Sequence, residues 1–339
     1  DRVFVARDTR TSGEMFENAA ASGLASVGVD VARLGITPTP AAVRYADVHG
    51  RPGLVITASH NPPEYNGVKL VGADGIELGV DRLETVEDHI LAEDFAIAAW
   101  DEVGAVDRVD AVNREYVATL LAAVDREAIA AADLTVAVDP GHGAGALTSP
   151  EFFRQLGCDV VTVNATPDGH FPGRQPEPVA SRLDDLRSLV TAADADVGIA
   201  HDGDADRAVF VDETGAFVAG EASLAALATA ELEPGDTTVA AVNVSQRLVD
   251  ACERVGAELE LTPIGSTNII TRIRELTAAG DRAPTAGVGN GGVFFPGYPL
   301  VRGRTPAGAE FPAVAAQPPS SELAPPYPAS QTVPLPLPY

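Results

Sequence analysis

An acidic loop directly after an apolar segment carries the strongest chemical signal in the sequence. It reads Asp-Gly-Asp-Ala-Asp-Arg at 202–207 and follows the apolar run 197–200. Three carboxylates at alternate positions of a tight loop need a cation to offset their charge, and hard oxygen ligands suit Mg²⁺ or Ca²⁺. Arg207 beside them indicates a substrate phosphate or sugar oxygen nearby. The alternative, in so acidic a chain, is a solvent-exposed acidic turn that binds no cation.

A calcium-trapping EF-hand loop is excluded, even though Glu213 stands at the twelfth position of such a loop. Arg207 occupies the position where that loop needs glycine, and residues 208–211 are strand-like rather than helical. The spacing therefore favours an oxygen-ligated cation site between two strands.

A serine turn is the second candidate. Thr-Ala-Ser-His-Asn-Pro at 57–62 follows the apolar run 54–56, and Lys69, the only lysine of the chain, comes ten residues after Ser59. A strand that ends in such a turn places an exposed hydroxyl at the carboxyl edge of a sheet, where α/β proteins put their sites. A lone ammonium near a serine suits phosphate or proton handling. The alternative is an ordinary polar turn stopped by two prolines. Gly-x-Ser-x-Gly is absent, so a hydrolase elbow is not supported.

A glycine-rich segment at 287–292 formally matches the dinucleotide fingerprint, but the strand-like run 293–295 follows it instead of a helix, which argues against that function. It is either a loop that lets a sugar approach closely or a plain turn. The segment around Arg174, Gly-Arg-Gln-Pro-Glu-Pro at 173–178, is either a rigid turn or a rim where Arg174 faces an anion. His142 is expected to be structural, and 262–265 reads as a turn.

Strand-like and helix-like segments alternate along the chain, which predicts βαβ units and an α/β fold. This rhythm pauses at 79–108 and at 212–220, where we place domain boundaries. The strand-like runs are 3–6, 54–57, 136–139, 160–163, 197–200, 209–211, 239–242 and 293–295, and the helix-like stretches are 14–27, 113–131, 183–193 and 246–255.

Composition narrows the function classes. The chain has 339 residues and a formal net charge of −26, which opposes binding to nucleic acid. Twenty-two arginines and one lysine in an acidic chain are typical of a salt-rich cytoplasm, which indicates a halophilic source. No apolar run is long enough to span a membrane, and the two cysteines, Cys158 and Cys252, indicate a reducing, cytoplasmic setting. Ten prolines in 305–339 predict an extended, disordered tail.

Taken together, the motifs resemble the α-D-phosphohexomutase family, the phosphomannomutase and phosphoglucomutase enzymes. The resemblance covers about residues 1–303 and rests on the serine turn, Asn-Gly-Val-Lys at 66–69, the acidic loop, and two further motifs, Arg-Asp-Thr-Arg-x-Ser at 7–12 and Phe-Pro-Gly-Arg-x-Pro-x-Pro at 171–178. It implies three consecutive mixed-sheet α/β domains, expected at 1–95, 96–212 and 213–304. The family's fourth domain is expected to be missing, with the proline-rich tail 305–339 in its place.

The resemblance also assigns roles. Ser59 would be the phosphoserine, and Lys69 and His60 would be further catalytic residues. The cofactors would be Mg²⁺ and glucose or mannose 1,6-bisphosphate as activator, and the substrates would be hexose phosphates. The metal ligands would be Ser59, Asp202, Asp204 and Asp206, and the substrate contacts Arg207, Arg10, Asn290, Gly289, Thr262 and Gly265.

The implied activity interconverts hexose 1-phosphate and 6-phosphate through phosphoserine and a 1,6-bisphosphate. Three departures from the family pattern bear on it. Val288 stands where the family's sugar loop has glutamate, the family's opening Gly-Ile-Arg-Gly segment is missing, and so is the phosphate clamp of its fourth domain. The alternatives are a phosphoglucosamine mutase, a phosphatase that admits water, or a non-catalytic remnant that binds sugar phosphate or Mg²⁺.

Overall fold

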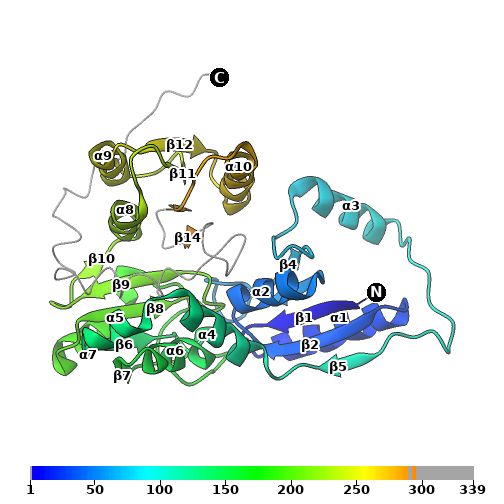
Figure 1. Ribbon diagram of the computed structural model, residues 1–339. Helices are drawn as coiled ribbons and strands as arrows, with labels where there is room; N and C mark the ends of the chain where they lie inside the picture. The colour runs from blue at the N-terminus through cyan, green and yellow to red at the C-terminus, as the bar shows by residue number, and fades with distance from the viewer. Residues whose placement is uncertain (1, 289–291, 295–339) are drawn as a thin grey trace.

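A five-stranded sheet forms the first of three α/β units in the computed structural model, which describes residues 2–288 and 292–294 (Figure 1). Its strand order is β4-β3-β1-β2-β5, and all neighbours are parallel except β3 and β4. The central strand holds Phe4, Val5 and Ala6 with no exposed surface, as expected for a parallel strand covered on both faces. The elements are β1 (Arg2–Arg7), α1 (Gly13–Ser26), β2 (Asp30–Ile36), α2 (Thr39–His49), β3 (Gly53–Ile56), β4 (Val68–Val71), α3 (Val80–Leu91) and β5 (Val106–Arg108).

The second unit holds a mixed sheet in the order β10-β9-β8-β6-β7. Strands β8 and β9 are buried along their whole length and run antiparallel, so the acidic loop is the turn of a buried hairpin. The elements are α4 (Val112–Ala123), α5 (Arg126–Ala131), β6 (Thr135–Asp139), the 3₁₀ turn η1 (Ala144–Leu147), α6 (Ser149–Gln155), β7 (Asp159–Thr162), the 3₁₀ turn η2 (Ala180–Arg182), α7 (Asp184–Ala193), β8 (Val197–His201), β9 (Ala208–Asp212) and β10 (Phe217–Val218).

The third unit has the strand order β12-β11-β13-β14, parallel except for β13 and β14. One apolar cluster runs from Phe4 through Tyr116 and Val136 to Leu248, so residues of all three units share a core. The elements are α8 (Gly220–Glu231), β11 (Thr237–Ala241), α9 (Gln246–Val255), β12 (Glu258–Thr262), α10 (Ser266–Ala279), β13 (Ala286–Val288) and β14 (Gly292–Phe294).

Three α/β units with mixed sheets confirm the expected fold class. Every predicted strand overlaps an observed one, but the predicted helix 113–131 is wrong as a single element. It breaks at Val124, which is extended, and Asp125 then caps α5 by accepting a hydrogen bond from the Ala128 amide at 3.0 Å. The predicted pause at 79–108 contains α3 and β5, and β5 pairs with β2 although it follows the boundary expected at residue 95.

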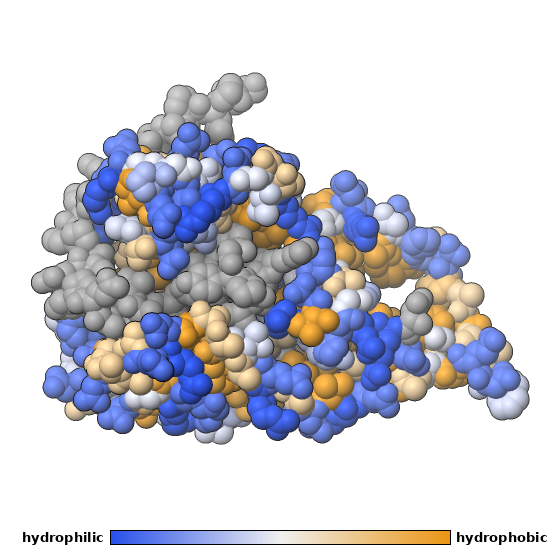
Figure 2. Space-filling view, viewed as in Figure 1, coloured by the Kyte–Doolittle hydropathy of each residue, from blue (hydrophilic) through white to orange (hydrophobic). Residues whose placement is uncertain are grey.

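Helix α3 stands apart from the core. None of its residues is buried, and Figure 2 shows apolar surface along it. Leu91 is 75% exposed and Trp100, in the segment that follows, is 90% exposed. Among the described helices, none is both long and apolar enough to cross a membrane. The expected tail 305–339 lies outside the described residues.

Both cysteines are free, and burial raises the pKa of each thiol to about 11, from 9.0. At pH 8 the thiolate fraction is then about a hundredfold below that of an ordinary thiol. We expect native protein to react with an alkylating reagent at least about a hundredfold more slowly than urea-unfolded protein. Labelling read by intact mass checks this; equal rates would show that Cys158 in α6–β7 and Cys252 in α9 are accessible.

Candidate active site at the serine and aspartate loops

The acidic loop places its three carboxylates at one point. Ligand oxygens of Asp202, Asp204 and Asp206 all lie within 4.8 Å of one another, and the first two residues have no exposed surface. Burial is the largest cause that raises the pKa of Asp202 well above its usual value, followed by the charges of Asp204 and Asp206. The loop therefore concentrates negative charge where water screens it poorly, and cations must offset that charge.

The serine turn lies against this loop. The Ser59 hydroxyl donates to Asp202 Oδ2 at 2.6 Å, although the two residues belong to different units. Gly203 makes the approach possible, since a Cβ there would lie 2.7 Å from the Ser59 carbonyl oxygen. Ser59 itself has a φ of +50°, a left-handed conformation that is uncommon for residues other than glycine, and such residues gather at functional sites.

Arg10 holds the serine turn in place. Its side chain is fully buried, and its guanidinium makes five hydrogen bonds, one for each N–H group. The predicted substrate contact does not fit this geometry, because no donor is left for a ligand. Arg10 is therefore a positioning residue. The acceptors are Asp8 Oδ2 and the carbonyl oxygens of Ser59, Asn61, Pro62 and Tyr65.

Asp8 completes this buried network. Its carboxylate accepts hydrogen bonds from Thr57 Oγ1 at 2.7 Å, from Arg10 Nε at 2.9 Å and from the Arg10 amide at 2.9 Å. Burial raises the pKa of Asp8 to about 6, and the nearby Arg10 charge opposes that rise. The serine turn thus rests on an ion pair that has no exposed surface.

Lys69 enters the aspartate cluster from β4. Its ammonium donates to Asp204 Oδ2 at 2.9 Å and to Asp206 Oδ2 at 2.8 Å. Thr39, at the start of α2, donates its hydroxyl to Asp204 Oδ2 at 2.6 Å. The other oxygen, Asp204 Oδ1, is buried and has no hydrogen-bond partner among the described residues.

The oxygen set fits a hard divalent cation. Three carboxylates and the Ser59 hydroxyl converge, and an orphaned buried carboxylate oxygen is costly unless an ion or another donor satisfies it. A divalent cation here would be held by Ser59, Asp202, Asp204 and Asp206.

Arg207 and His60 lie at the edge of the cluster. Arg207 Nε is 4.0 Å from both Asp202 Oδ2 and Asp206 Oδ1, and the residue lines a cavity of about 250 Å³ together with Glu177 and Glu221. Burial, and after it the Arg207 charge, lowers the pKa of His60. The imidazole is therefore held neutral near an arginine that faces open space.

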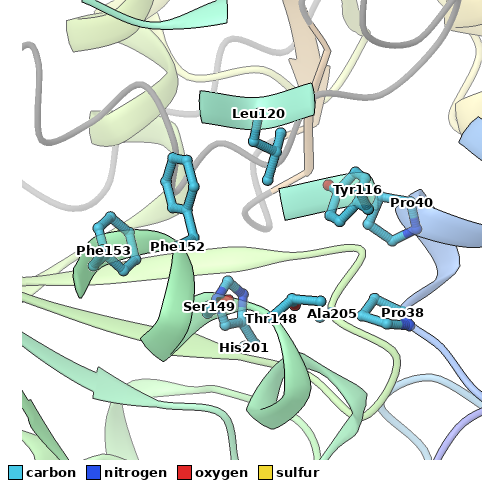
Figure 3. A pocket seen from close by; sticks show the side chains of 10 residues that line it. All are labelled: Pro38, Pro40, Tyr116, Leu120, Thr148, Ser149, Phe152, Phe153, His201 and Ala205. Carbon is cyan, nitrogen blue, oxygen red and sulfur yellow. Dashed lines mark hydrogen bonds between the residues drawn. The ribbon is translucent and has the colours of Figure 1, made fainter. Parts of the chain in front are cut away.

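His201 supports the loop from behind. Its Nδ1 donates to the Arg207 carbonyl oxygen at 3.0 Å, so its Nε2 accepts from the Ser149 hydroxyl at 2.8 Å. Figure 3 shows both residues in a mostly apolar pocket with Tyr116, Leu120 and the two phenylalanines of α6. Its free volume of about 20 Å³ suits a single water molecule rather than a ligand.

The remaining predicted residues have mixed outcomes. Arg174 is buried and bonds to Asp139 Oδ2 at 2.7 Å and to backbone oxygens. Of the two alternatives for residues 173–178, the structure therefore favours a rigid turn over a rim where Arg174 faces an anion. His142 is structural, bonded to Thr166 and Gly173.

The four other predicted substrate contacts are only partly described. Thr262 ends β12 with its hydroxyl turned to backbone carbonyls, and Gly265, at a φ of +135°, precedes α10. No hydrogen bond or ion pair in the described part of the chain joins them to the serine turn. Gly289 and Asn290 lie outside the described residues.

Comparison with known proteins agrees with this geometry. Profiles of the phosphoglucomutase/phosphomannomutase alpha/beta/alpha domains I, II and III match residues 1–97, 114–215 and 212–304. A phosphoglucomutase/phosphomannomutase of Thermococcus kodakarensis is 44% identical over 88% of this chain and 65% of its own length. A probable phosphoglucosamine mutase of Methanosphaera stadtmanae is 40% identical over 81% of this chain and 60% of its own.

Solved structures show the same fold. A phosphoglucomutase/phosphomannomutase family protein of Burkholderia thailandensis has a TM-score of 0.82 at 29% identity, over 95% of this chain and 70% of that one. A putative phosphomannomutase of Thermus thermophilus has a TM-score of 0.80 at 28% identity, over 93% and 71%.

Three mixed α/β units and a serine turn seated on an aspartate loop define a protein of the phosphohexomutase type. The chain belongs to the phosphoglucomutase/phosphomannomutase family. It spans between three fifths and two thirds of the length of the curated relatives named above.

The raised pKa of Asp8 predicts a pH dependence of stability. Between pH 6 and 3.8 the folded state binds a proton at Asp8 that the unfolded state does not, so acidification relieves the cost of burying this charge. We expect wild type to gain about 2 kcal/mol of unfolding free energy relative to Asp8→Asn as pH falls from 7 to 4. Urea unfolding at several pH values measures it. A pH-independent difference would contradict it.

Proposed function

We propose that this chain is a phosphohexomutase that transfers a phosphoryl group between Ser59 and a hexose phosphate. The observation that carries the proposal is the 2.6 Å hydrogen bond from Ser59 Oγ to Asp202 Oδ2 inside a cluster of three carboxylates. A hydroxyl beside oxygen ligands for a divalent cation and beside the only lysine of the chain is suited to phosphoryl transfer.

The residues around Ser59 divide the work. Arg10 fixes the serine turn, and Asp202 orients the Ser59 oxygen. Lys69 and Arg207 would contact the equatorial oxygens of the transferring group. When bound, Mg²⁺ would neutralise charge on that group.

In the forward step, the bond from phosphorus to Ser59 Oγ breaks as a bond to a sugar hydroxyl oxygen forms. The hydroxyl proton must leave, and His60, which burial keeps neutral, is the base proposed to accept it. The product is a hexose 1,6-bisphosphate. This intermediate reorients in the site and then returns its other phosphate to Ser59. The transfer uses no water, and water that reached phospho-Ser59 would hydrolyse it, so the site must exclude water.

The proposed substrates are the 1- and 6-phosphates of mannose or glucose, with the corresponding 1,6-bisphosphate as activator. Glucosamine phosphate is the second candidate, because relatives at about 40% identity are named as probable phosphoglucosamine mutases. Gly289, Asn290, Thr262 and Gly265 are proposed to contact the sugar. The halophilic source, the cytoplasmic location and the domain boundaries stay predictions.

Ser59→Ala should abolish phosphate uptake. We expect wild type with Mg²⁺ and glucose 1,6-bisphosphate, in about 2 M KCl to screen its net charge, to gain one phosphate that maps to Ser59. Intact mass before and after incubation is the measurement. Ser26→Ala on α1 is the matched control and should be phosphorylated normally. A phosphorylated Ser59→Ala protein would place the nucleophile elsewhere, and an unphosphorylated, folded wild type would favour the non-catalytic remnant.

Asp204→Asn should weaken Mg²⁺ binding about tenfold or more, because it removes one ligand charge from the cluster. Isothermal calorimetry with MgCl₂ measures the change. Asp47→Asn, which removes a carboxylate from a partly buried ion pair with Arg44, is the control and should bind Mg²⁺ like wild type. Equal affinity in Asp204→Asn would show that the metal binds outside the acidic loop.

A further inference from the structure

Strand β4 continues into a hairpin, residues 68–78, which we call the β4 hairpin. The amide of Leu78 donates to the Leu70 carbonyl at 2.9 Å, that of Gly72 donates to the Ile76 carbonyl at 2.7 Å, and Val71 bridges Glu77. The turn is firmly seated, because Gly75 lies so close to α2 that a Cβ would be 2.6 Å from the Val43 carbonyl oxygen. The hairpin is therefore one continuous hydrogen-bonded ladder whose turn is held against α2.

The near end of the hairpin belongs to the aspartate cluster. Lys69 donates to Asp204 and Asp206, and Glu77 Oε1 lies 3.9 Å from Lys69 Nζ. Lys69 and Glu77 are diagonal neighbours in the ladder and share one of its faces.

The tip of the hairpin belongs to the third unit. Ile76 is 8% exposed and is part of the apolar cluster formed with α10 residues Ile269, Ile270 and Ile273. Asp74 Oδ1 accepts the Ile76 amide at 3.2 Å, while its Oδ2 pairs with Arg274 of α10. Both members of that ion pair are half exposed, so the pair contributes little to stability. The buried Ile76 side chain therefore contributes most of the stabilisation of this contact, and the ion pair orients the hairpin tip on α10.

Two adjacent residues of the hairpin, Ile76 and Glu77, thus face the third unit and the aspartate cluster respectively. Ile76 contacts α10, and Glu77 contacts the ammonium that bonds to Asp204 and Asp206. Because the hydrogen-bonded ladder connects them, a shift of α10 that keeps its contact with Ile76 is passed on to Glu77 and Lys69.

We propose that α10 positions Lys69 through the β4 hairpin, so that seating of the third unit sets the place of the ammonium in the phosphoryl-transfer centre. This inference rests on the proposed function for its catalytic consequence, but not for its structural one. Ile76 and Asp74 are then positioning residues, since neither lies in the aspartate cluster itself.

The chain offers a direct probe, because Lys69 is its only lysine. Protein grown with ¹³C,¹⁵N-lysine gives a single side-chain Cε–Nζ correlation, which reports the surroundings of the ammonium without any turnover. We expect Ile76→Ala and Arg274→Ala each to shift or broaden this signal. The charge-swapped double variant Asp74→Arg/Arg274→Asp should restore it toward the wild-type position.

Arg272→Ala is the matched control. It removes another arginine of α10, whose partners Glu260 and Glu275 lie within the third unit, and it should leave the signal unchanged. Alkylation of Cys252 tests whether each variant keeps the third unit folded. An unchanged Lys69 signal in folded Ile76→Ala and Arg274→Ala proteins would overturn the proposal, as would an equal shift in Arg272→Ala.

The same variants separate this inference from the proposed function. We expect phosphorylation of Ser59 by glucose 1,6-bisphosphate to slow about tenfold in Ile76→Ala. If wild type takes up no phosphate, the proposed function fails while the lysine signal still decides the positioning role. If wild type is phosphorylated and Ile76→Ala matches its rate, the catalytic consequence is wrong.

Discussion

Three carboxylates within 4.8 Å of one another, two of them buried, are the constraint around which the molecule is built. Such a cluster is costly unless donors and cations reach it. The second unit supplies the carboxylates on the β8–β9 hairpin, while the first supplies Ser59, Thr39 and Lys69. Compensation of charge therefore requires the two units to dock, and the candidate active site is the place where they do.

Two buried arginines hold the backbone of the loops that meet at the aspartate cluster, one in each unit. Arg10 bonds four carbonyl oxygens of the serine turn, and Arg174 bonds carbonyl oxygens at the ends of β6 and β8. Each buried guanidinium also pairs with a buried aspartate, Asp8 or Asp139. Arginine suits this task because its planar fork satisfies several fixed acceptors at once. Two of the buried arginines thus serve the shape of the loops rather than a ligand.

The sequence predicts that the serine turn and the acidic loop end apolar strands, but it does not predict which arginines support these loops. Apolar runs that end in polar turns identify β3 and β8, and alternate aspartates identify the carboxylate cluster, because both signals are local. In the sequence, Arg10 and Arg174 look the same as arginines that bind a substrate. Only the structure shows that both are buried and that their N–H groups already donate to protein acceptors. Thr39 gives no local signal for its bond to Asp204, which lies 165 residues away. Strand β2 is missed because Asp30 and Arg33 interrupt its apolar pattern.

The contacts of Lys69 have a consequence for how the protein is made. Protein donors already reach all three carboxylates, through Ser59 to Asp202 and through Lys69 to Asp204 and Asp206. Ser59 and Lys69 precede residues 202–207 in the chain, so the donors that the acidic loop needs are already synthesised when the loop itself leaves the ribosome.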